Sequence, residues 1–352
     1  MHSTLLLAAL TIFSATLTPS SNGVVAQPSQ FEERDLTGFN HALRRRHHAK
    51  SKRHGHHHHH HDWNNNNGWN SGWKSGNNNG GDNSSSSSSQ TTATSTSATS
   101  TSSSTATATS TSKAGLAWPN GNANPIGSWE NGKIDWYYTW SAYPVDGSSL
   151  NFMPMLWGSD KVSEWEQQKD KFDSLKVTAI LGMNEPNESS QSNLDASSAA
   201  SLWNQYIAPY KGKYTLISPA CTSSTGYNGG IEWLQRFQQS GADFDAVATH
   251  IYETDPEKVI EYLQNIYNTF QKPIYLTEFA CQNYSGGSQC SQDEVWQFLI
   301  KTTQWMDQQD FIHGYSYFGA MMSMQGVNEF NQLLSSDGSS PTDLGNYYLQ
   351  SA

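Results

Sequence analysis

Residues 177–186 read VTAILGMNEP, an apolar run that ends by presenting Asn184 and Glu185 in front of a proline. Residues 273–282, PIYLTEFACQ, repeat the arrangement, because strand-forming residues again lead to a carboxylate, that of Glu278. Short apolar runs bounded by turn-forming residues are typical of buried strands. The two strings therefore predict two strands that each carry a glutamate at the C-terminal end.

Outward from these strings, strand-like runs alternate with amphipathic helical patterns, which is typical of βα units. The six further strand-like runs lie at 115–120, 134–140, 152–158, 214–220, 245–252 and 311–319. Helices are expected near 162–174, 195–209, 229–240, 255–270 and 291–308, and the segment 341–350 could close the ring. Asp255 is the expected N-cap of its helix, with Pro256 at the first helical position.

Eight strands with helical crossovers in about 240 residues predict an α/β fold, a (β/α)8 or TIM barrel. A doubly wound sheet is the alternative, but no glycine-rich phosphate loop follows the first strand.

The first 112 residues differ in composition from the rest. Residues 1–26 contain a short apolar stretch followed by small residues, which predicts a signal peptide and a secreted protein, with cell-wall association as a further option. A membrane anchor is the competing interpretation, although the apolar run is too short to span a bilayer. Residues 27–112 are rich in His, Asn, Ser and Thr and predict a disordered tail and stalk. The folded domain is expected at 113–352.

Charge and cysteine content limit the partners of this domain. From residue 113 onward the chain has 12 basic and 26 acidic residues, a balance of −14, which disfavours nucleic acid and anionic membranes. Cys281 and Cys290 bracket a Gly/Ser-rich loop and are candidates for a disulfide, which would leave Cys221 as a buried thiol. No zinc-ligand spacing is present, and only His250 and His313 lie in the domain, so we expect no metal and no cofactor there. The six histidines at 56–61 could bind a divalent metal, but a solvated low-complexity tract or an engineered tag explains them equally well.

The active site of such a barrel lies at the C-terminal ends of its strands. The residues at these ends are Trp118, Asn120, Trp136, Tyr138, Trp140, Trp157, Asn184, Glu185, Ser218, His250, Tyr252, Glu278, Tyr317 and Phe318. The set combines two carboxylates with many aromatics and contains no Lys or Arg, which favours a neutral polyhydroxylated ligand. Two carboxylates beside an aromatic cleft indicate glycoside hydrolysis, and their expected separation of about 5–5.5 Å is that of a retaining enzyme.

The strings GLAWPN, DWYYTW, FMPMLWG, ILGMNEPNESSQSNL, ISPACTS, FDAVATHIY, IYLTEFAC and GYSYFGAM occur in this order from Gly115 to about Ala320. In this the chain resembles glycoside hydrolase family 128, a clan A family of (β/α)8 enzymes that act on β-1,3-glucan. The resemblance implies that Glu185 is the general acid/base, that Glu278 is the nucleophile and that no cofactor is needed. Asn184 would bond the 2-hydroxyl of the sugar, and Tyr252 would donate to Glu278.

Further substrate-binding candidates are the aromatics Trp118, Trp136, Trp157 and Tyr317, together with Asn120, Tyr138 and His250. Met183, Ile251 and Tyr317 depart from the residues usual in the family, which leaves endo or exo action open. We expect Asn187 of the first sequon to be unmodified and Asn283 to be the more exposed acceptor.

The leading hypothesis is a secreted, monomeric, retaining endo-β-1,3-glucanase whose partner is β-1,3-glucan polysaccharide or oligosaccharide. A wall protein that binds this glucan and cleaves it weakly or not at all is the second hypothesis. A clan A glycosidase acting on β-mannan or β-1,4-glucan is the third.

Overall fold

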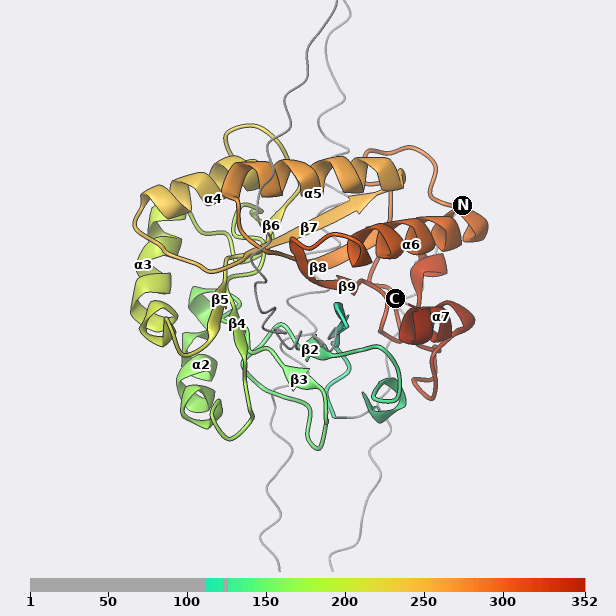
Figure 1. Cartoon of the computed structure of the whole chain (residues 1–352), viewed down its shortest axis with the longest axis horizontal. Helices are drawn as coiled ribbons and strands as arrows, with labels where there is room; N and C mark the ends of the chain where they lie inside the picture. Colours follow the sequence, from blue (N-terminus) through green and yellow to red (C-terminus); the bar gives the residue numbers. More distant parts are fainter. Residues whose placement is uncertain (1–111, 123, 125, 352) are drawn as a thin grey trace, which may run out of the picture.

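The computed structural model describes residues 112–122, 124 and 126–351. The predicted signal peptide lies outside the described residues, as does the predicted tail and stalk as far as residue 111. The described chain is an α/β domain in which helices surround parallel strands (Figure 1), so the predicted fold class is confirmed.

The strands follow the predicted runs closely. They are β1 (Ala114–Ala117), β2 (Trp136–Tyr138), β3 (Asn151–Phe152), β4 (Ala179–Leu181), β5 (Thr215–Ile217), β6 (Cys221–Thr222), β7 (Val247–Glu253), β8 (Ile274–Cys281) and β9 (Ile312–Tyr317). Seven of them form one sheet in the order β3-β2-β1-β9-β8-β7-β6, and β4 pairs with β5. Every one of these pairs is parallel.

Backbone hydrogen bonds join the two sheets at both edges and complete the ring. On one side, Leu181 of β4 donates its N–H to the carbonyl oxygen of Pro154 over 2.9 Å. On the other side, Ser218 donates to the carbonyl oxygen of Ala246 over 2.9 Å. β5 and β6 belong to one strand position, which is interrupted at Pro219 because proline has no N–H for the ladder. The ring therefore has the predicted eight strand positions.

Helices cover the outside of the ring. The α-helices are α2 (Val162–Gln168), α3 (Ala196–Tyr206), α4 (Gly230–Gln239), α5 (Pro256–Phe270), α6 (Gln292–Asp307) and α7 (Asp343–Ser351). The short 3-10 helices are η1 (Ile126–Trp129), η2 (Ser159–Lys161), η3 (Lys169–Lys171), η4 (Ala208–Tyr210) and η5 (Glu329–Asn331). The helix predicted over 162–174 is α-helical only as far as Gln168 and then tightens into η3.

Two sequence signals at helix ends act as predicted. Asp255 caps α5, because its carboxylate accepts the N–H of Glu257 at 3.0 Å, and Pro256 is the first helical residue. The predicted closing segment is α7, where the buried hydroxyl of Tyr348 donates to the carbonyl oxygen of Gly115 in β1 over 2.8 Å. The same hydroxyl accepts the N–H of Tyr317 in β9, so α7 fastens the first strand to the last.

Trp136 fills part of the barrel interior. Its indole packs so closely against Gly115 of β1 that a methyl group there would overlap the ring, and it lies 3.1 Å from the place that a methyl group at Gly314 of β9 would occupy. Its indole N–H donates to the carbonyl oxygen of Lys113 at the start of β1. Trp136 is therefore a core residue at the N-terminal side of the strands, and the prediction that it stacks on sugar is corrected.

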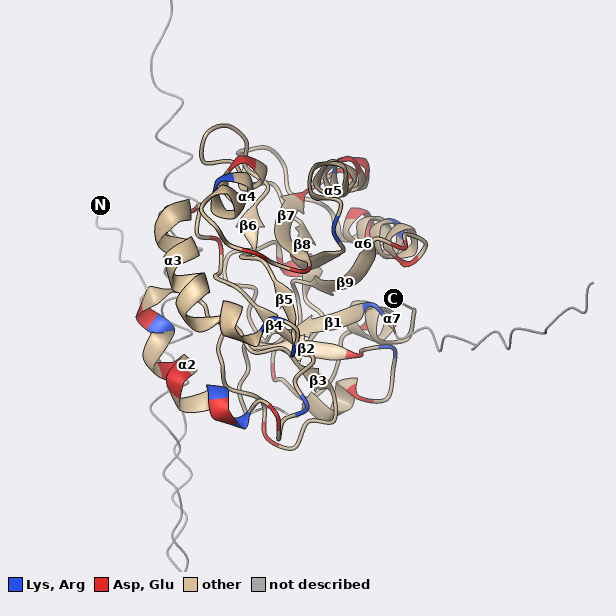
Figure 2. Ribbon diagram, turned by 60° about the vertical axis from the view of Figure 1, so that its left-hand side comes forward, with Lys and Arg blue, Asp and Glu red and all other residues tan. Residues whose placement is uncertain are grey.

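Charged residues lie mainly on the helices and loops around the sheet, while most of the sheet is free of them (Figure 2). The glutamates Glu185 and Glu278 are exceptions, since both are buried at the ring. Among the described residues, the model contains no helix with the length and apolar character needed to cross a membrane.

Candidate active site

Glu185 and Glu278 meet at the C-terminal side of the ring. Glu185 follows β4 and is held there by its own N–H, which donates to the carbonyl oxygen of Ala220 over 2.7 Å. Its φ of 41° lies in the left-handed region, an unfavourable conformation for a residue with a side chain. One oxygen of Glu185, one oxygen of Glu278 and a ring nitrogen of His250 all lie within 4.8 Å of one another. The chain between the two glutamates, residues 186–277, thus brings the two carboxyl groups close together.

His250 lies between the two carboxylates. Its Nδ1 is 2.9 Å from Oε1 of Glu185 and 3.4 Å from Oε2 of Glu278. Its Nε2 is 2.9 Å from the hydroxyl of Thr277, which fixes the ring from the opposite side. The register of β7 against β8 shifts between Thr249 and His250, and this irregularity places His250 opposite Glu278. His250 is therefore a central residue of the site.

Two side chains hold the carboxylate of Glu278. Tyr252 donates its hydroxyl to Oε2 over 2.6 Å, the contact that the family resemblance implied. Trp140 donates its indole N–H to Oε1 over 2.8 Å. Hydrogen bonds to a charged acceptor are stronger than neutral ones and favour the ionised form. The pair therefore orients Glu278 and stabilises it as a carboxylate.

Trp140 is one of the residues predicted at the strand ends, and no function was predicted for it from the sequence. The φ of Trp140 is 54°, again in the left-handed region, so the backbone leaves its extended path at this residue. Its ring packs against Tyr138, with ring centres 4.8 Å apart, and against Phe318 at 6.1 Å. Phe318 also contacts Tyr252, with ring centres 5.6 Å apart. The four aromatic residues Tyr138, Trp140, Phe318 and Tyr252 thus form a continuous wall beside Glu278.

Asn184 presents a hydrogen-bond acceptor in the site. Its amide nitrogen donates to Oε1 of Gln191 over 3.2 Å, and its main-chain oxygen accepts the hydroxyl of Ser192 over 2.7 Å. Its side-chain oxygen is buried and has no hydrogen-bond partner among the described residues. A buried acceptor without a donor is costly unless a ligand supplies one, so this oxygen fits the role predicted for it, to accept a sugar hydroxyl. Gln191, which orients the amide, was missed from the sequence.

Three further predicted binding residues are core residues, because each is fully buried and bonded within the protein. Trp118 donates its indole N–H to the carbonyl oxygen of Gly121 over 3.1 Å. Tyr138 donates its hydroxyl to the carbonyl oxygen of Thr277 over 2.9 Å and so supports the segment that carries Glu278. Tyr317 packs against Phe279, and its hydroxyl bonds Asn331. None of the three offers a ring face for stacking, so their predicted stacking or binding role is corrected.

Two predicted residues remain at the rim of the site. Trp157, just after β3, is half-buried and keeps part of its ring exposed. Asn120 lies beyond β1 and donates its amide to the carbonyl oxygen of Ala320 over 2.8 Å, which ties the loop after β1 to the loop after β9. Ser218, another strand-end residue, has a structural role, because its hydroxyl accepts the N–H of Ala248 beside the break at Pro219.

The loops around the site are braced. Cys281 and Cys290 form a disulfide that closes the loop after β8, and Cys221 is a buried free thiol. Burial raises the pKa of the Cys221 thiol well above its usual value, so this residue is not a candidate nucleophile. The side-chain amides of Asn187 and Asn283 each make hydrogen bonds through both their nitrogen and their oxygen. Both residues are half-buried, so the expectation that Asn283 is the more exposed acceptor is corrected.

The group formed by Glu185, His250 and Glu278 also has the side-chain types of a metal site. Both oxygens of Glu278 already accept hydrogen bonds from Trp140 and Tyr252. Oε1 of Glu185 is likewise within hydrogen-bond distance of His250. Three of the four carboxylate oxygens of this group thus lie within hydrogen-bond distance of protein side chains.

Comparison with known proteins assigns this chain to a family. The family model described as "Glycosyl hydrolase catalytic core" matches residues 115–348. The chain belongs to glycoside hydrolase family 128. Alkali-sensitive linkage protein 1 of Schizosaccharomyces pombe is 32% identical over 245 residues, which are 67% of this chain and 44% of that protein. The chain thus spans less than half the length of the curated relative.

Solved structures of family 128 superimpose on the domain. An exo-β-1,3-glucanase from Aureobasidium namibiae is 25% identical with a TM-score of 0.60, covering 68% of this chain and 96% of its own. An endo-β-1,3-glucanase from Amycolatopsis mediterranei, solved with laminaritriose, is 26% identical with a TM-score of 0.55, covering 68% and 98%. An oligosaccharide-binding protein from Trichoderma gamsii is 26% identical with a TM-score of 0.53, covering 67% and 92%. The family 128 fold therefore occurs both in glucanases and in a binding protein.

Proposed function

We propose that this family 128 domain is a retaining endo-β-1,3-glucanase. The observation that carries the proposal is the meeting of Glu185 and Glu278, with an oxygen of each within 4.8 Å. Retaining enzymes have carboxyl groups about 5–5.5 Å apart, whereas inverting enzymes leave about 6.5–9.5 Å for a water molecule. The short separation supports a double displacement.

In the first step, Glu278 attacks the anomeric carbon and forms a glycosyl ester. The bond from that carbon to the leaving oxygen breaks, and Glu185 gives its proton to this oxygen. In the second step, Glu185 takes a proton from water, whose oxygen attacks the anomeric carbon and releases Glu278. The donors Trp140 and Tyr252 keep Glu278 ionised and oriented before each attack.

The endo-β-1,3-glucanase from Amycolatopsis mediterranei, which is 26% identical to this chain, supports endo action. The same relative, solved with laminaritriose, supports a β-1,3-glucan as the substrate.

The test measures reducing ends released from laminarin by the wild type, Glu185→Gln and Glu278→Gln. We expect both variants to remain folded and to lose at least a thousandfold in kcat, because each removes a group that forms or breaks a bond. Proton NMR of the first products should show the β-anomer. Initial release of the α-anomer would contradict the retaining mechanism, and activity of either variant near the wild-type level would contradict the assignment of its glutamate.

The second candidate function is glucan binding without cleavage. The oligosaccharide-binding relative from Trichoderma gamsii supports it. Wild-type protein that binds laminarihexaose but yields no shorter products after prolonged incubation would establish this function in place of the first. Parallel incubations with β-mannan and β-1,4-glucan test the third specificity.

We also propose that the protein is secreted. The composition of residues 1–26 and the disulfide between Cys281 and Cys290 support this, because disulfides persist in oxidising compartments. N-terminal sequencing of protein from the culture medium of an expressing host should begin at or beyond Gln27. A product found only inside the cells, with Met1 retained, would contradict secretion.

A further inference from the structure

The loop that follows β8 is closed by the disulfide between Cys281 and Cys290. Most of its residues are exposed, and Tyr284 is the one aromatic residue among 282–289. The ring of Tyr284 is half-buried and packs edge-to-face against the ring of Tyr252 in β7, with ring centres 5.5 Å apart and planes at 68°. Tyr252 is the residue whose hydroxyl donates to Glu278. The disulfide-closed loop therefore contacts a donor of the active site.

Tyr252 is contacted by two other rings. Phe318, directly after β9, lies with its ring centre 5.6 Å away at an angle of 74°, and Tyr284 adds the second edge-to-face contact. Such aromatic pairs have a preferred geometry, so they restrict the orientations that a ring can adopt. The hydroxyl of Tyr252 reaches Oε2 of Glu278 over 2.6 Å only from a narrow range of these orientations. Both neighbouring rings therefore help to aim this hydrogen bond.

Hydrogen bonds fix the loop that carries Tyr284. The main-chain N–H of Asn283 donates to Oε1 of Gln289 over 2.9 Å, and Nε2 of Gln289 donates to the carbonyl oxygen of Asn283 over 2.8 Å. The side-chain amide of Asn328 donates to the carbonyl oxygen of Cys290 over 2.8 Å. The loop is thus joined at its ends by the disulfide, across its middle by a reciprocal pair, and to the segment after β9 by an asparagine.

We propose that Tyr284 is a positioning residue, held by the disulfide-closed loop, that keeps Tyr252 where its hydroxyl bonds Glu278. The inference rests on the proposed function, because it takes Glu278 as the nucleophile. Tyr284 acts through Tyr252 and not on the substrate. Residues 282–289 include two glycines and two serines, so an open loop would have many conformations and would hold the ring poorly.

Ionisable side chains from several elements face Glu278, namely Glu185 after β4, His250 and Tyr252 of β7, and Tyr138 of β2. Removal of the Tyr284 ring loosens Tyr252 and leaves the other three side chains in the protein. The hydrogen bond from Tyr252 favours the ionised form of Glu278, so its loss makes that carboxyl group harder to ionise. The acidic limb of the pH profile of kcat/KM reports the ionisation of the free enzyme, and it should therefore move to higher pH.

The test compares Tyr284→Ala, which removes the ring, with Tyr284→Phe, which keeps it. On laminarin we expect Tyr284→Ala to lower kcat about three- to tenfold, the size of one aromatic pair contact, with KM little changed and the acidic limb moved to higher pH. Tyr284→Phe should stay within about twofold of the wild type and keep its pH profile, because the edge-to-face contact remains.

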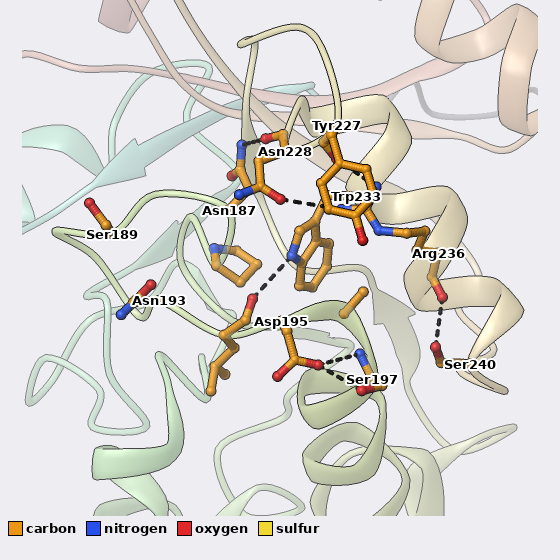
Figure 3. Close-up of a pocket in the computed structure, with 13 residues that line it drawn as sticks. Asn187, Ser189, Asn193, Asp195, Ser197, Tyr227, Asn228, Trp233, Arg236 and Ser240 are labelled. Carbon is orange, nitrogen blue, oxygen red and sulfur yellow. Dashed lines mark hydrogen bonds between the residues drawn. The ribbon is translucent and has the colours of Figure 1, made fainter. Parts of the chain in front are cut away.

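Tyr227→Ala is the control at another loop. Tyr227 lies before α4, and its ring packs against the guanidinium of Arg236, 4.1 Å from the ring centre (Figure 3). The substitution therefore also removes a loop tyrosine that packs on a neighbouring side chain, but away from Glu278. We expect the kcat and the pH profile of the wild type.

The double variant Cys281→Ala with Cys290→Ala tests the part played by the loop. It keeps Tyr284 and opens the covalent ring, so we expect a lower kcat and a shift of the acidic limb in the same direction. Wild-type kcat and pH profile in this variant would overturn the role of the disulfide.

The remaining outcomes separate this inference from the proposed function. If the wild type cleaves laminarin and Tyr284→Ala cleaves it equally well, or with a raised KM at unchanged kcat and pH profile, the positioning role is overturned and the glucanase assignment stands. If the wild type cleaves no glucan, the glucanase assignment fails, and a crystal structure of Tyr284→Ala decides about Tyr252. A Tyr252 hydroxyl displaced beyond about 3.5 Å from Glu278 supports the positioning role, and a hydroxyl still in hydrogen-bond contact overturns it.

Discussion

Trp140 donates its indole N–H to Oε1 of Glu278 over 2.8 Å, although 138 residues separate the two in the sequence. The strained backbone of Trp140, with φ at 54°, is what aims the ring at the carboxylate. Strain of this kind persists only where the surrounding structure enforces it, and it is frequent at functional sites. The contact makes Trp140 a positioning residue for Glu278, the proposed nucleophile.

Trp140→Phe keeps one aromatic ring and removes the donor together with the rest of the indole, a loss of volume that the control variant shares. A hydrogen bond to a charged group contributes about 1.5–3 kcal/mol, so kcat on laminarin should fall about 10- to 100-fold while KM changes little. Trp165→Phe is the matched control, because the indole N–H of Trp165 is buried without a hydrogen-bond partner among the described residues. A rise in KM at unchanged kcat would assign Trp140 to substrate binding instead.

Gly115→Ala tests the packing of Trp136 inside the barrel. The new methyl group would overlap the indole, and overpacking of this kind costs about 1–3 kcal/mol in the free energy of unfolding. Gly127→Ala is the control, since a methyl group at Gly127 meets no atom within 4 Å and should change stability by less than about 0.5 kcal/mol. Urea unfolding measures both. Equal stability of the two variants would contradict the interior position of Trp136.

The sequence was sufficient to predict the barrel and the proximity of Glu185 and Glu278. Parallel strands expose their C-terminal ends at the same edge of a sheet. Glu185 and Glu278, each predicted at the end of a strand, are therefore expected at the same edge of the barrel. The contact between Tyr252 and Glu278 followed from the family resemblance. These predictions require only that a residue can be placed at the end of a particular strand. Apolar runs bounded by turn residues are enough to locate the strands.

The direction of individual side chains was harder to predict. Along β9, Gly314 faces Trp136 in the interior, so alternation turns Tyr315 and Tyr317 outward and brings Phe318 to the wall of the site. From the sequence, sugar stacking was predicted for Tyr317. Gly314 and Ser316 share the interior face of β9, so Tyr317 lies on the opposite face. The shift at His250 and the left-handed backbone of Trp140 have no local sequence signal, because tertiary contacts impose them.

Thr277→Val tests the orientation of His250. The substitution keeps the shape of the side chain and removes the hydroxyl that lies 2.9 Å from Nε2, so the ring loses one of its two anchors. A net hydrogen bond contributes about 0.5–1.5 kcal/mol, and we expect kcat on laminarin to fall about three- to tenfold. Thr303→Val is the control, because it removes a buried hydroxyl that bonds only main-chain oxygens of α6. The same loss of kcat in both variants would show a general effect of buried hydroxyls.

Asp195 contributes a pH-dependent part of the stability as the N-cap of α3. Hydrogen bonds from Ser197 and Ser198 hold the pKa of its carboxyl well below the usual value of 3.8. Because the folded pKa is the lower one, the contribution is complete above about pH 5 and is lost as the pH falls through the folded value. Asp195→Ala should lower the free energy of unfolding at pH 7 by about 1 kcal/mol, the usual contribution of an N-cap. Asp195→Asn, which caps without a charge, should keep most of this stability at pH 7.

Urea unfolding from pH 7 to pH 2.5 should show the difference between wild type and Asp195→Ala shrinking below pH 4. A constant difference over this range would mean that the charge of Asp195 adds nothing to the cap.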